Sequence, residues 1–254
     1  MSDYISLNDA LAQLASRLSL SVDDLKAYAY EDQYGGRDTG DFSAMTIHRV
    51  EGQLLYALVR ALKPETVLEI GTADGGSATH ILAALAANQS GQLLSYDLIE
   101  GSGGNIPATL RDRWTFVQED VITAELPSAD FIFEDSAHTL DFSILLFEKL
   151  KALQPRLLLT HDYYTDEVYA NFAVRQAFEQ VFDGEAFGMK LNDAFTGIGA
   201  WVNPEWEITA RINDALEHHD SLAGARALQE RTAVRKPRTP AAKKPTPAKR
   251  TAKR

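Results

Sequence analysis

Two clusters of ionisable side chains follow apolar stretches of the chain. Asp135 and His138 come after one such stretch, and His161 and Asp162 come directly after the next. Short apolar stretches of this kind are typical of buried parallel strands, whose carboxyl ends meet at one edge of a sheet. Four side chains that converge there can bind a divalent ion and move a proton. The alternative is that they only cap the strands or line a solvated rim.

A glycine-rich stretch earlier in the chain indicates a ligand-binding turn. Residues 66–70 form a short apolar run, and Gly71, Gly75 and Gly76 follow it before a helical stretch. The glycines permit a tight turn and a close approach of the backbone to a ligand. Their spacing is not G-x-G-x-x-G, and no Gly-Lys-Ser/Thr follows, so the dinucleotide fingerprint and the phosphate-binding loop are both missing. The alternative interpretation is a turn that binds nothing.

Two further carboxylates follow the next two apolar stretches. Asp97 lies at the end of the stretch 92–98, and Asp120 follows the stretch 114–118. A carboxylate at a strand end can accept hydrogen bonds from both hydroxyls of a ribose, which favours a nucleoside-containing ligand. The alternative for Asp97 is a helix-capping or surface residue.

The order of these stretches predicts one main α/β domain with a doubly wound, mostly parallel sheet of seven strands. Strands are expected at 66–70, 92–98, 114–118, 129–133 and 156–160, with a closing antiparallel pair at 185–191 and 198–202. Helices are expected at 7–18, 22–32, 46–63, 78–87, 142–153 and 168–181, and again within 206–229. We divide the chain into a helical lid or dimer arm at 1–45, the main domain at 46–230 and a tail at 231–254.

Composition limits the compartment and the class of protein. A chain of 254 residues that is 45% hydrophobic can bury one substantial core. It has no cysteine, which excludes disulfides and thiolate chemistry and fits a reducing compartment. Its first residues are acidic rather than basic and apolar, and no apolar run approaches the roughly 18 residues that span a membrane. We therefore expect a cytoplasmic protein without a membrane segment.

The tail differs in charge from the rest of the chain. Residues 231–254 hold ten of the 25 Lys and Arg and none of the 36 Asp and Glu, which leaves 15 cations against 36 acids, a net −21, in residues 1–230. The tail is rich in Pro, Ala and Thr and has no apolar period, so it is expected to be disordered. Three interpretations stay open: weak non-specific binding to nucleic acid, folding back onto the acidic body, and a solubilising tail without a partner.

The glycine turn also carries a family resemblance. The pattern Glu69-x-Gly71-x-x-x-Gly75-x-Ser77 resembles the first motif of the class I S-adenosylmethionine-dependent methyltransferases. The resemblance implies a Rossmann-like methyltransferase fold over about residues 46–203. It also implies that these four residues form the cofactor loop, with Glu69 orienting the loop and the amino-acid end of the cofactor. Further implied cofactor contacts are Asp97 to the ribose and Asp120 to the adenine amino group.

The two polar clusters narrow the resemblance. Asp135-x-x-His138 and the later Leu-Leu-x-His161-Asp162-Tyr resemble the metal-dependent small-molecule O-methyltransferases, which are related to catechol O-methyltransferase and to enzymes that methylate sugars and antibiotic precursors. The resemblance implies that Asp135, His161 and Asp162 hold a divalent ion such as Mg²⁺. His138 stands where catechol-type enzymes place a lysine base. This chain departs from the pattern in having a His-Asp pair instead of two oxygen ligands, which leaves room for a transition metal.

The resulting hypothesis is S-adenosylmethionine-dependent methylation of a small-molecule hydroxyl, assisted by a divalent ion, with Asp135 and His138 in catalytic roles. Three alternatives remain: a nucleic-acid methyltransferase guided by the tail, a non-catalytic nucleotide-binding module, and a Rossmann oxidoreductase. The missing G-x-G-x-x-G disfavours the oxidoreductase, and no Asn/Asp-Pro-Pro-Tyr signature supports methylation of DNA amino groups. A homo-oligomer joined through the N-terminal arm is a further expectation.

Overall fold

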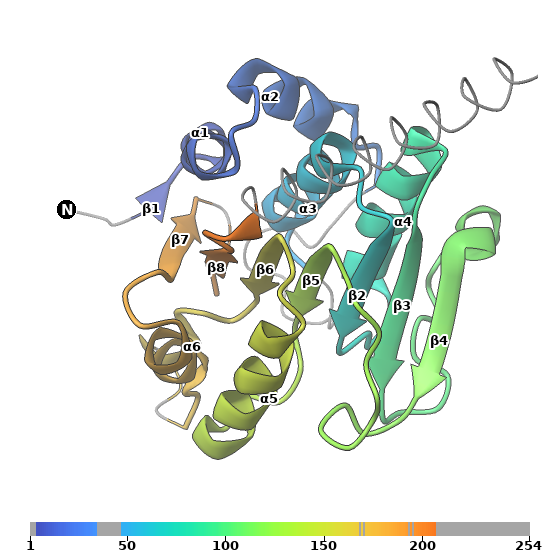
Figure 1. The fold of residues 1–254 in the computed structure, drawn as a ribbon. Helices are drawn as coiled ribbons and strands as arrows, with labels where there is room; N and C mark the ends of the chain where they lie inside the picture. Colours follow the sequence, from blue (N-terminus) through green and yellow to red (C-terminus); the bar gives the residue numbers. More distant parts are fainter. Residues whose placement is uncertain are drawn as a thin grey trace, which may run out of the picture. The chain divides into compact units, whose positions relative to one another are not determined.

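One mixed sheet organises the protein, as Figure 1 shows. The structure, a computed structural model, describes residues 4–34, 47–167, 169, 171–192, 194 and 196–206. Within this part of the chain the strand order is β1-β7-β8-β6-β5-β2-β3-β4. The strands are β1 (Tyr4–Ile5), β2 (Thr66–Ile70), β3 (Gln92–Asp97), β4 (Trp114–Gln118), β5 (Phe131–Glu134), β6 (Leu157–Thr160), β7 (Phe187–Leu191) and β8 (Ile198–Val202). β8 is antiparallel to both of its neighbours, and the other pairs are parallel.

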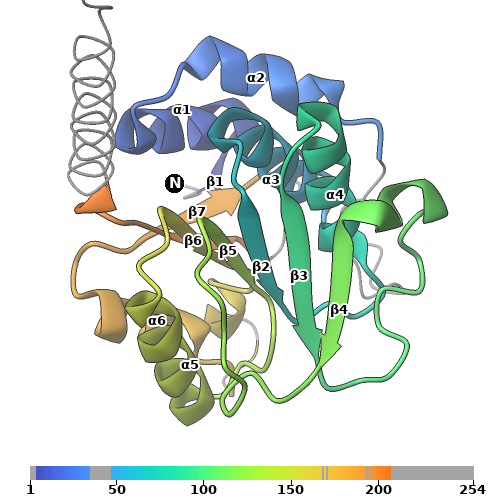
Figure 2. The same ribbon diagram turned by 45° about the vertical axis from the view of Figure 1, so that its right-hand side comes forward.

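The order of the strands places a ligand crevice beside β2. From β2 the chain moves outward to β3 and β4, and it then returns to the other side of β2 to form β5 and β6. Ligands of open α/β sheets bind where the strand order reverses, at the carboxyl ends of the strands. Figure 2 shows the central strands pointing the same way, so that these ends share one edge of the sheet. The reversal between β2 and β5 therefore positions the site.

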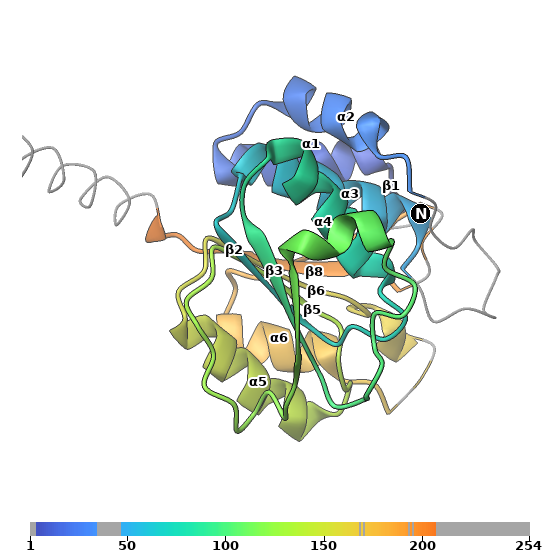
Figure 3. The ribbon, with the colours of Figure 1, turned by 90° about the vertical axis from the view of Figure 1, so that its right-hand side faces the viewer.

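Helices cover both faces of the sheet (Figure 3). On one side, α3 (Arg49–Leu62) and α4 (Gly76–Asn88) pack together, α2 (Val22–Glu31) packs on α3, and α1 (Leu7–Leu18) contacts α2, α3 and β7. On the other side lie α5 (Leu140–Ala152) and α6 (Val174–Phe182). Two short 3-10 helices span Ala108–Arg113 and Thr165–Glu167.

The central strands are apolar because both of their faces are buried. In β2, Val67 belongs to the core under α3 and α4, whereas Leu68 and Ile70 belong to the core under α5 and α6. Glu69 points to the same side as Val67, since side chains alternate along a strand. This alternation directs its carboxylate toward α4 and the glycine turn.

Most predicted elements are confirmed, with differences that have local causes. The helix expected at 168–181 begins only at Val174, because the backbone N–H of Ala173 donates to the carbonyl of His138 and holds the preceding chain in an irregular path. The sheet has eight strands in place of the expected seven. The additional β1 has two residues, paired with Lys190 and Leu191 of β7, and is too short to show a sequence period.

Several expectations fall outside the described residues. They concern part of the N-terminal arm (residues 1–3 and 35–45), the helices within 207–229 and the tail at 231–254. The described residues up to Trp206 form one compact unit. The role of residues 1–45 as a lid or arm stays a prediction. In the described part of the chain, no helix is both long and apolar enough to cross a membrane.

Candidate active site

The glycine turn after β2 is packed directly against the end of β5. Gly71 and Gly75 have φ of +85° and +90°, in the left-handed region that glycine adopts without strain. A Cβ atom on Gly71 would lie 2.1 Å from the backbone oxygen of Asp135. Any side chain at this position would therefore push the turn away from the second strand end. The two predicted parts of the site, the glycine turn and the polar cluster, are in contact through this glycine.

Glu69, on β2, is hydrogen-bonded to the helix that follows the turn. Ser77 donates a hydrogen bond of 2.6 Å to one carboxylate oxygen of Glu69, and Ser95 donates one of 2.5 Å to the other. Ser95 is the residue paired with Glu69 across β2 and β3. Burial raises the pKa of Glu69 to about 7, against the lowering effect of the two serines. These contacts connect Glu69 to the start of α4 and to β3, and its role in orienting the loop and the cofactor stays a prediction.

Asp97 supports the same turn from β3. Its Oδ2 atom accepts hydrogen bonds from the backbone N–H of Thr72 (2.9 Å) and of Ala73 (3.0 Å), and its Oδ1 atom accepts one from Ile99 (2.9 Å). Burial alone would raise the pKa of Asp97, but these backbone hydrogen bonds lower it below the ordinary value. An anionic, half-buried carboxylate thus lies beside the loop, at the place predicted for a ribose contact.

A cavity opens at the turn, whereas Asp120 lies apart from it. The cavity has a volume of about 240 Å³ and is lined by Asp74, Gly75, Gly76 and Thr79 together with Tyr34, Asn105 and Pro107. Asp120 follows β4, is exposed, and accepts a hydrogen bond of 2.9 Å from the backbone of Ile122. Its predicted contact with the adenine therefore stays a prediction.

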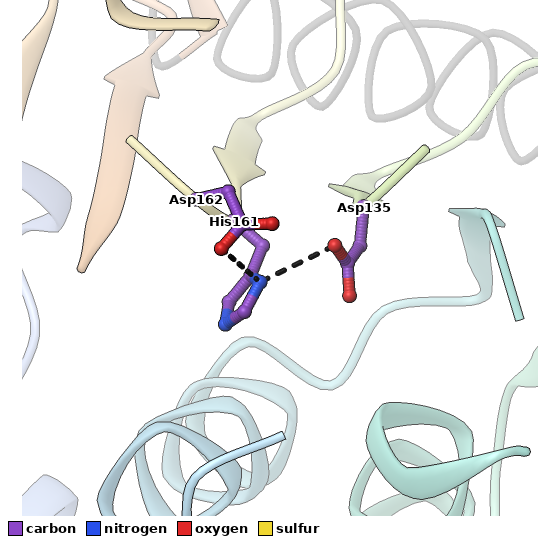
Figure 4. Close-up of side chains that lie close together, drawn as sticks. All are labelled: Asp135, His161 and Asp162. Carbon is purple, nitrogen blue, oxygen red and sulfur yellow. Dashed lines mark ion pairs between the residues drawn. The ribbon is translucent and has the colours of Figure 1, made fainter. Parts of the chain in front are cut away.

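Asp135, His161 and Asp162 converge at the ends of β5 and β6 (Figure 4). Nδ1 of His161 lies 3.2 Å from Oδ1 of Asp135 and 3.4 Å from Oδ1 of Asp162. Among the described residues, the buried Nδ1 atom has these two close contacts but no hydrogen bond. One ligand atom from each of the three residues lies within 4.8 Å of the others, which is close enough to share one ion. The predicted convergence is therefore present in the geometry.

The charges in this cluster act strongly on one another. Burial lowers the pKa of His161, but the carboxylates of Asp135, Glu51 and Asp162 raise it well above the ordinary value. Burial would raise the pKa of Asp162, yet His161 and His138 lower it well below its usual range. The histidines and carboxylates of the cluster therefore stabilise each other's charged forms.

His138 reaches the same cluster from the loop after β5. Its Nε2 atom lies 2.8 Å from Oδ2 of Asp162, and its ring packs on Phe172 with 4.7 Å between the centroids. Burial lowers the pKa of His138, but Asp162 raises it to a value above the ordinary one, with Asp135 and Glu134 adding to the effect. The imidazole is therefore held at the edge of the cluster by a carboxylate on one side and an aromatic ring on the other.

Two supporting carboxylates were missed in the sequence. Glu134 ends β5 and accepts hydrogen bonds from Ser136 and from Thr160, its cross-strand partner. Glu51 lies on α3, and its Oε2 atom is 3.0 Å from Nε2 of His161. A signal for Glu51 was available, since it occupies an apolar-face position of its helix, three residues before Leu54. A charged residue at such a position indicates a buried partner.

Comparison with known proteins agrees with this site. A family model described as a methyltransferase domain matches residues 68–163, a range that includes the glycine turn and the whole cluster of Asp135, His138, His161 and Asp162. A comparison with curated proteins gave no match.

Three solved structures illustrate the remote structural similarities. A putative O-methyltransferase from Klebsiella pneumoniae is 20% identical with a TM-score of 0.47, over 77% of this chain and 96% of that one. An O-methyltransferase from Bacillus cereus in complex with S-adenosylhomocysteine is 19% identical with a TM-score of 0.46, over 74% and 90%. The O-methyltransferase TomG from Streptomyces achromogenes, in complex with S-adenosylmethionine, is 16% identical with a TM-score of 0.47, over 77% and 96%. Similarities this remote assign no substrate to this chain.

The fold of the described residues agrees with the matched domain. Its sheet closes with the expected antiparallel pair, its first long strand leads into the glycine turn, and the matched domain covers both halves of the site. Residues 68–163 therefore match a methyltransferase domain that includes the glycine turn and the polar cluster.

Proposed function

We propose that this protein transfers the methyl group of S-adenosylmethionine to a hydroxyl group of a small molecule, with the help of a divalent ion. The observation that carries the proposal is the contact between the two halves of the site. Gly71 of the cofactor turn packs against the backbone of Asp135, which begins the cluster of carboxylates and histidines. A methyl donor on the turn and an acceptor at the cluster would therefore be neighbours.

The residues around the turn suit S-adenosylmethionine. Glu69 and Ser77 fix the turn, Gly71 and Gly75 keep its backbone accessible, and Asp97 presents a carboxylate for the ribose hydroxyls. Methyl transfer from a sulfonium is an in-line displacement, for which the protein mainly supplies position and orientation. The rigid hydrogen bonding beneath the turn supports such a positioning role.

The cluster suits a divalent ion. Two carboxylates lie beside a buried ring nitrogen that has no hydrogen-bond partner in the described part of the chain, and this is the donor set expected of a metal site. Asp135, His161 and Asp162 would hold the ion. When bound, a divalent ion supplies positive charge that lowers the pKa of an acceptor hydroxyl.

His138 is the residue proposed to take the proton of the acceptor. It lies at the edge of the cluster, and its ring is positioned by Asp162 and Phe172. Imidazole has an intrinsic pKa near neutrality, which suits general-base catalysis at physiological pH.

The test combines binding with transfer. Calorimetry should detect S-adenosylmethionine binding to the purified protein. Labelled methyl groups should then be transferred to members of a panel of catechols and sugars, and chelator should abolish this transfer. No binding of S-adenosylmethionine would refute the proposal as a whole, and transfer that persists in excess chelator would refute the role of the ion.

A second candidate acceptor is nucleic acid. The observation that favours it is the run of ten cations without an acid at residues 231–254. Such a segment binds phosphates without reading sequence. Methylation of RNA or DNA in the same labelled assay, lost when the tail is removed, would favour this alternative.

A further inference from the structure

Glu51 contacts the far side of the ring that faces the proposed ion. The Nε2–H group of His161 donates to Oε2 of Glu51 across 3.0 Å, and Oγ1 of Thr196 lies 3.2 Å from the same nitrogen. Glu51 is fully buried, and His161 is 6% exposed. With Nε2 occupied in this way, Nδ1 is the ring nitrogen that faces Asp135 and Asp162 (Figure 4).

The position of Glu51 is fixed by its own helix. Glu51 lies in the first turn of α3, where its Oε2 atom also accepts a hydrogen bond of 3.3 Å from the backbone N–H of His48. The amino-terminal end of a helix favours a negative charge, because the unpaired N–H groups there carry partial positive charge. The carboxylate is thus placed before any ligand arrives, and it can orient His161 without help from a bound molecule.

We propose that Glu51 is a positioning residue that turns Nδ1 of His161 toward Asp135 and Asp162, and that the cluster therefore prefers a divalent transition ion over Mg²⁺. This inference rests on the proposed metal-assisted function. A carboxylate that accepts the other N–H of a ligating histidine fixes the tautomer of the ring and makes the free nitrogen a better donor. In this chain the carboxylate comes from α3, which lies outside the matched residues 68–163.

The donor set decides the class of ion. One imidazole nitrogen and two carboxylates form a mixed nitrogen and oxygen site, which suits Fe²⁺, Co²⁺, Ni²⁺ or Zn²⁺. Mg²⁺ prefers oxygen ligands in near-ideal octahedral geometry and keeps several waters. The imidazole of His161 therefore shifts the preference away from Mg²⁺, and Glu51 strengthens this shift by orienting the ring.

The first measurement is ion affinity. The full chain is treated with chelator, desalted, and titrated with Co²⁺ and with Mg²⁺ by calorimetry. Glu51→Gln should weaken Co²⁺ binding by roughly tenfold to a hundredfold, the usual effect of removing such a supporting partner. Glu148→Gln is the matched control, because Glu148 is exposed on α5 and carries the same charge. Equal Co²⁺ affinity in the two variants would overturn the positioning role.

A second variant keeps the inference testable if Glu51→Gln folds poorly. His161→Asp replaces the nitrogen donor by oxygen and leaves Glu51 in place. The Co²⁺ preference over Mg²⁺, taken as the ratio of their dissociation constants, should fall at least tenfold, and an unchanged ratio would overturn the proposed ion class. In the Zn²⁺-loaded wild-type protein, nitrogen NMR should show His161 protonated on Nε2 and metallated on Nδ1, whereas a ring protonated on both nitrogens would show that it is no ligand.

Binding of the ion and binding of the cofactor are tested separately. S-adenosylmethionine binding is measured on the same preparation. If the cofactor binds and neither ion does, the inference about Glu51 and the ion is overturned and the methyl-transfer proposal survives without metal. If an ion binds with the expected dependence on Glu51 and the cofactor does not bind, the proposed function fails and the metal site stands.

Discussion

Glu69 is the buried carboxylate that joins the cofactor turn to two neighbouring elements. It accepts hydrogen bonds from Ser77 at the start of α4 and from Ser95 on β3, and Ser95 in turn accepts one from the indole N–H of Trp114. Burial favours the protonated form of such a carboxylate over the ionised form, because desolvation penalises the charge. This preference links the stability of the fold to pH.

The first prediction concerns this link. The pKa of Glu69 rises from 4.5 to about 7 on folding, so the unfolded chain ionises first as pH increases. The contribution of Glu69 to stability is fully present below pH 4.5, decreases as pH rises through this window, and levels off above about pH 7. Urea unfolding of wild type and Glu69→Gln at pH 5 and pH 8 should show that the free energy of unfolding falls by roughly 2.5 kcal/mol more in wild type than in the variant. If the free energy of unfolding fell equally in both proteins between pH 5 and pH 8, the raised pKa of Glu69 would be contradicted.

The second prediction tests the ribose carboxylate. Asp97→Ala removes an anionic acceptor beside the turn and should weaken S-adenosylmethionine binding on the order of a hundredfold, since hydrogen bonds to charged groups contribute about 1.5–3 kcal/mol each. Asp112→Ala, at an exposed position in the 3-10 helix before β4, is the matched control and should bind normally. Calorimetry on both variants makes the comparison. If Asp97→Ala binds as well as the control, the cofactor lies elsewhere.

The third prediction separates the base from the ion site. His138→Ala should retain the affinities for S-adenosylmethionine and for the ion, yet lose roughly a hundredfold in turnover, the usual scale of a positioned base. Asp162→Ala should instead lose the ion and turnover together, because Asp162 contacts both histidines. Turnover of His138→Ala equal to that of wild type would exclude His138 as the base.

At the scale of elements, the antiparallel strands β7 and β8 support the turn that carries two of the proposed ligands. Asp162 has φ of +55°, a left-handed conformation that is costly for a residue other than glycine. The next residue, Tyr163, packs its ring against Gly188 and Gly199 and donates a hydrogen bond of 2.9 Å to Glu179 on α6. The ring thereby anchors the strained turn to the sheet.

The fourth prediction follows from this anchor. In Gly199→Ala the new Cβ atom would lie 2.2 Å from the ring of Tyr163, so the ring must move. The free energy of unfolding should fall by about 1–3 kcal/mol, as for other overpacked sites, and the ion affinity should fall with it. Gly104→Ala is the control, since its new Cβ atom would be 3.6 Å from the nearest atom. Unfolding by urea and titration with Co²⁺ measure the two effects, and a Gly199→Ala protein that matches the control would contradict the anchoring role.

Much of this architecture was readable from the sequence because the signals were local. The apolar run 66–70 gave the correct bounds of β2, and the helix expected at 7–18 has the bounds of α1. The position of Glu51 on the apolar face of its helix indicated a buried partner, but that partner, His161, could not be identified, because no local pattern links a helix to a distant strand end. The support of the Asp162 turn by Gly188 and Gly199 was missed for the same reason, since only the folded sheet brings these residues together.

At the scale of the whole molecule, charge divides the chain into two parts. Residues 1–230 have 15 cations and 36 acids, whereas residues 231–254 have ten cations and no acid. An acidic body repels polyanions, and a short cationic segment attracts them through the release of counterions. Any affinity for nucleic acid should therefore belong to the tail, and methyl transfer to the body.

The last prediction tests this division. Removing residues 231–254 should abolish any shift of DNA or RNA in a gel, while methyl transfer to a small hydroxylated acceptor and S-adenosylmethionine affinity stay unchanged. In the full chain the shift should weaken steeply as salt increases, because each phosphate contact releases a bound counterion. Replacing the ten Lys and Arg of the tail by Gln keeps the length of the segment and should have the same effect as removing it, which assigns the binding to charge. If the truncated protein still shifted nucleic acid, the division of roles would be contradicted. Residues 1–230 would then have a basic surface in spite of their net charge of −21, from 15 cations and 36 acids.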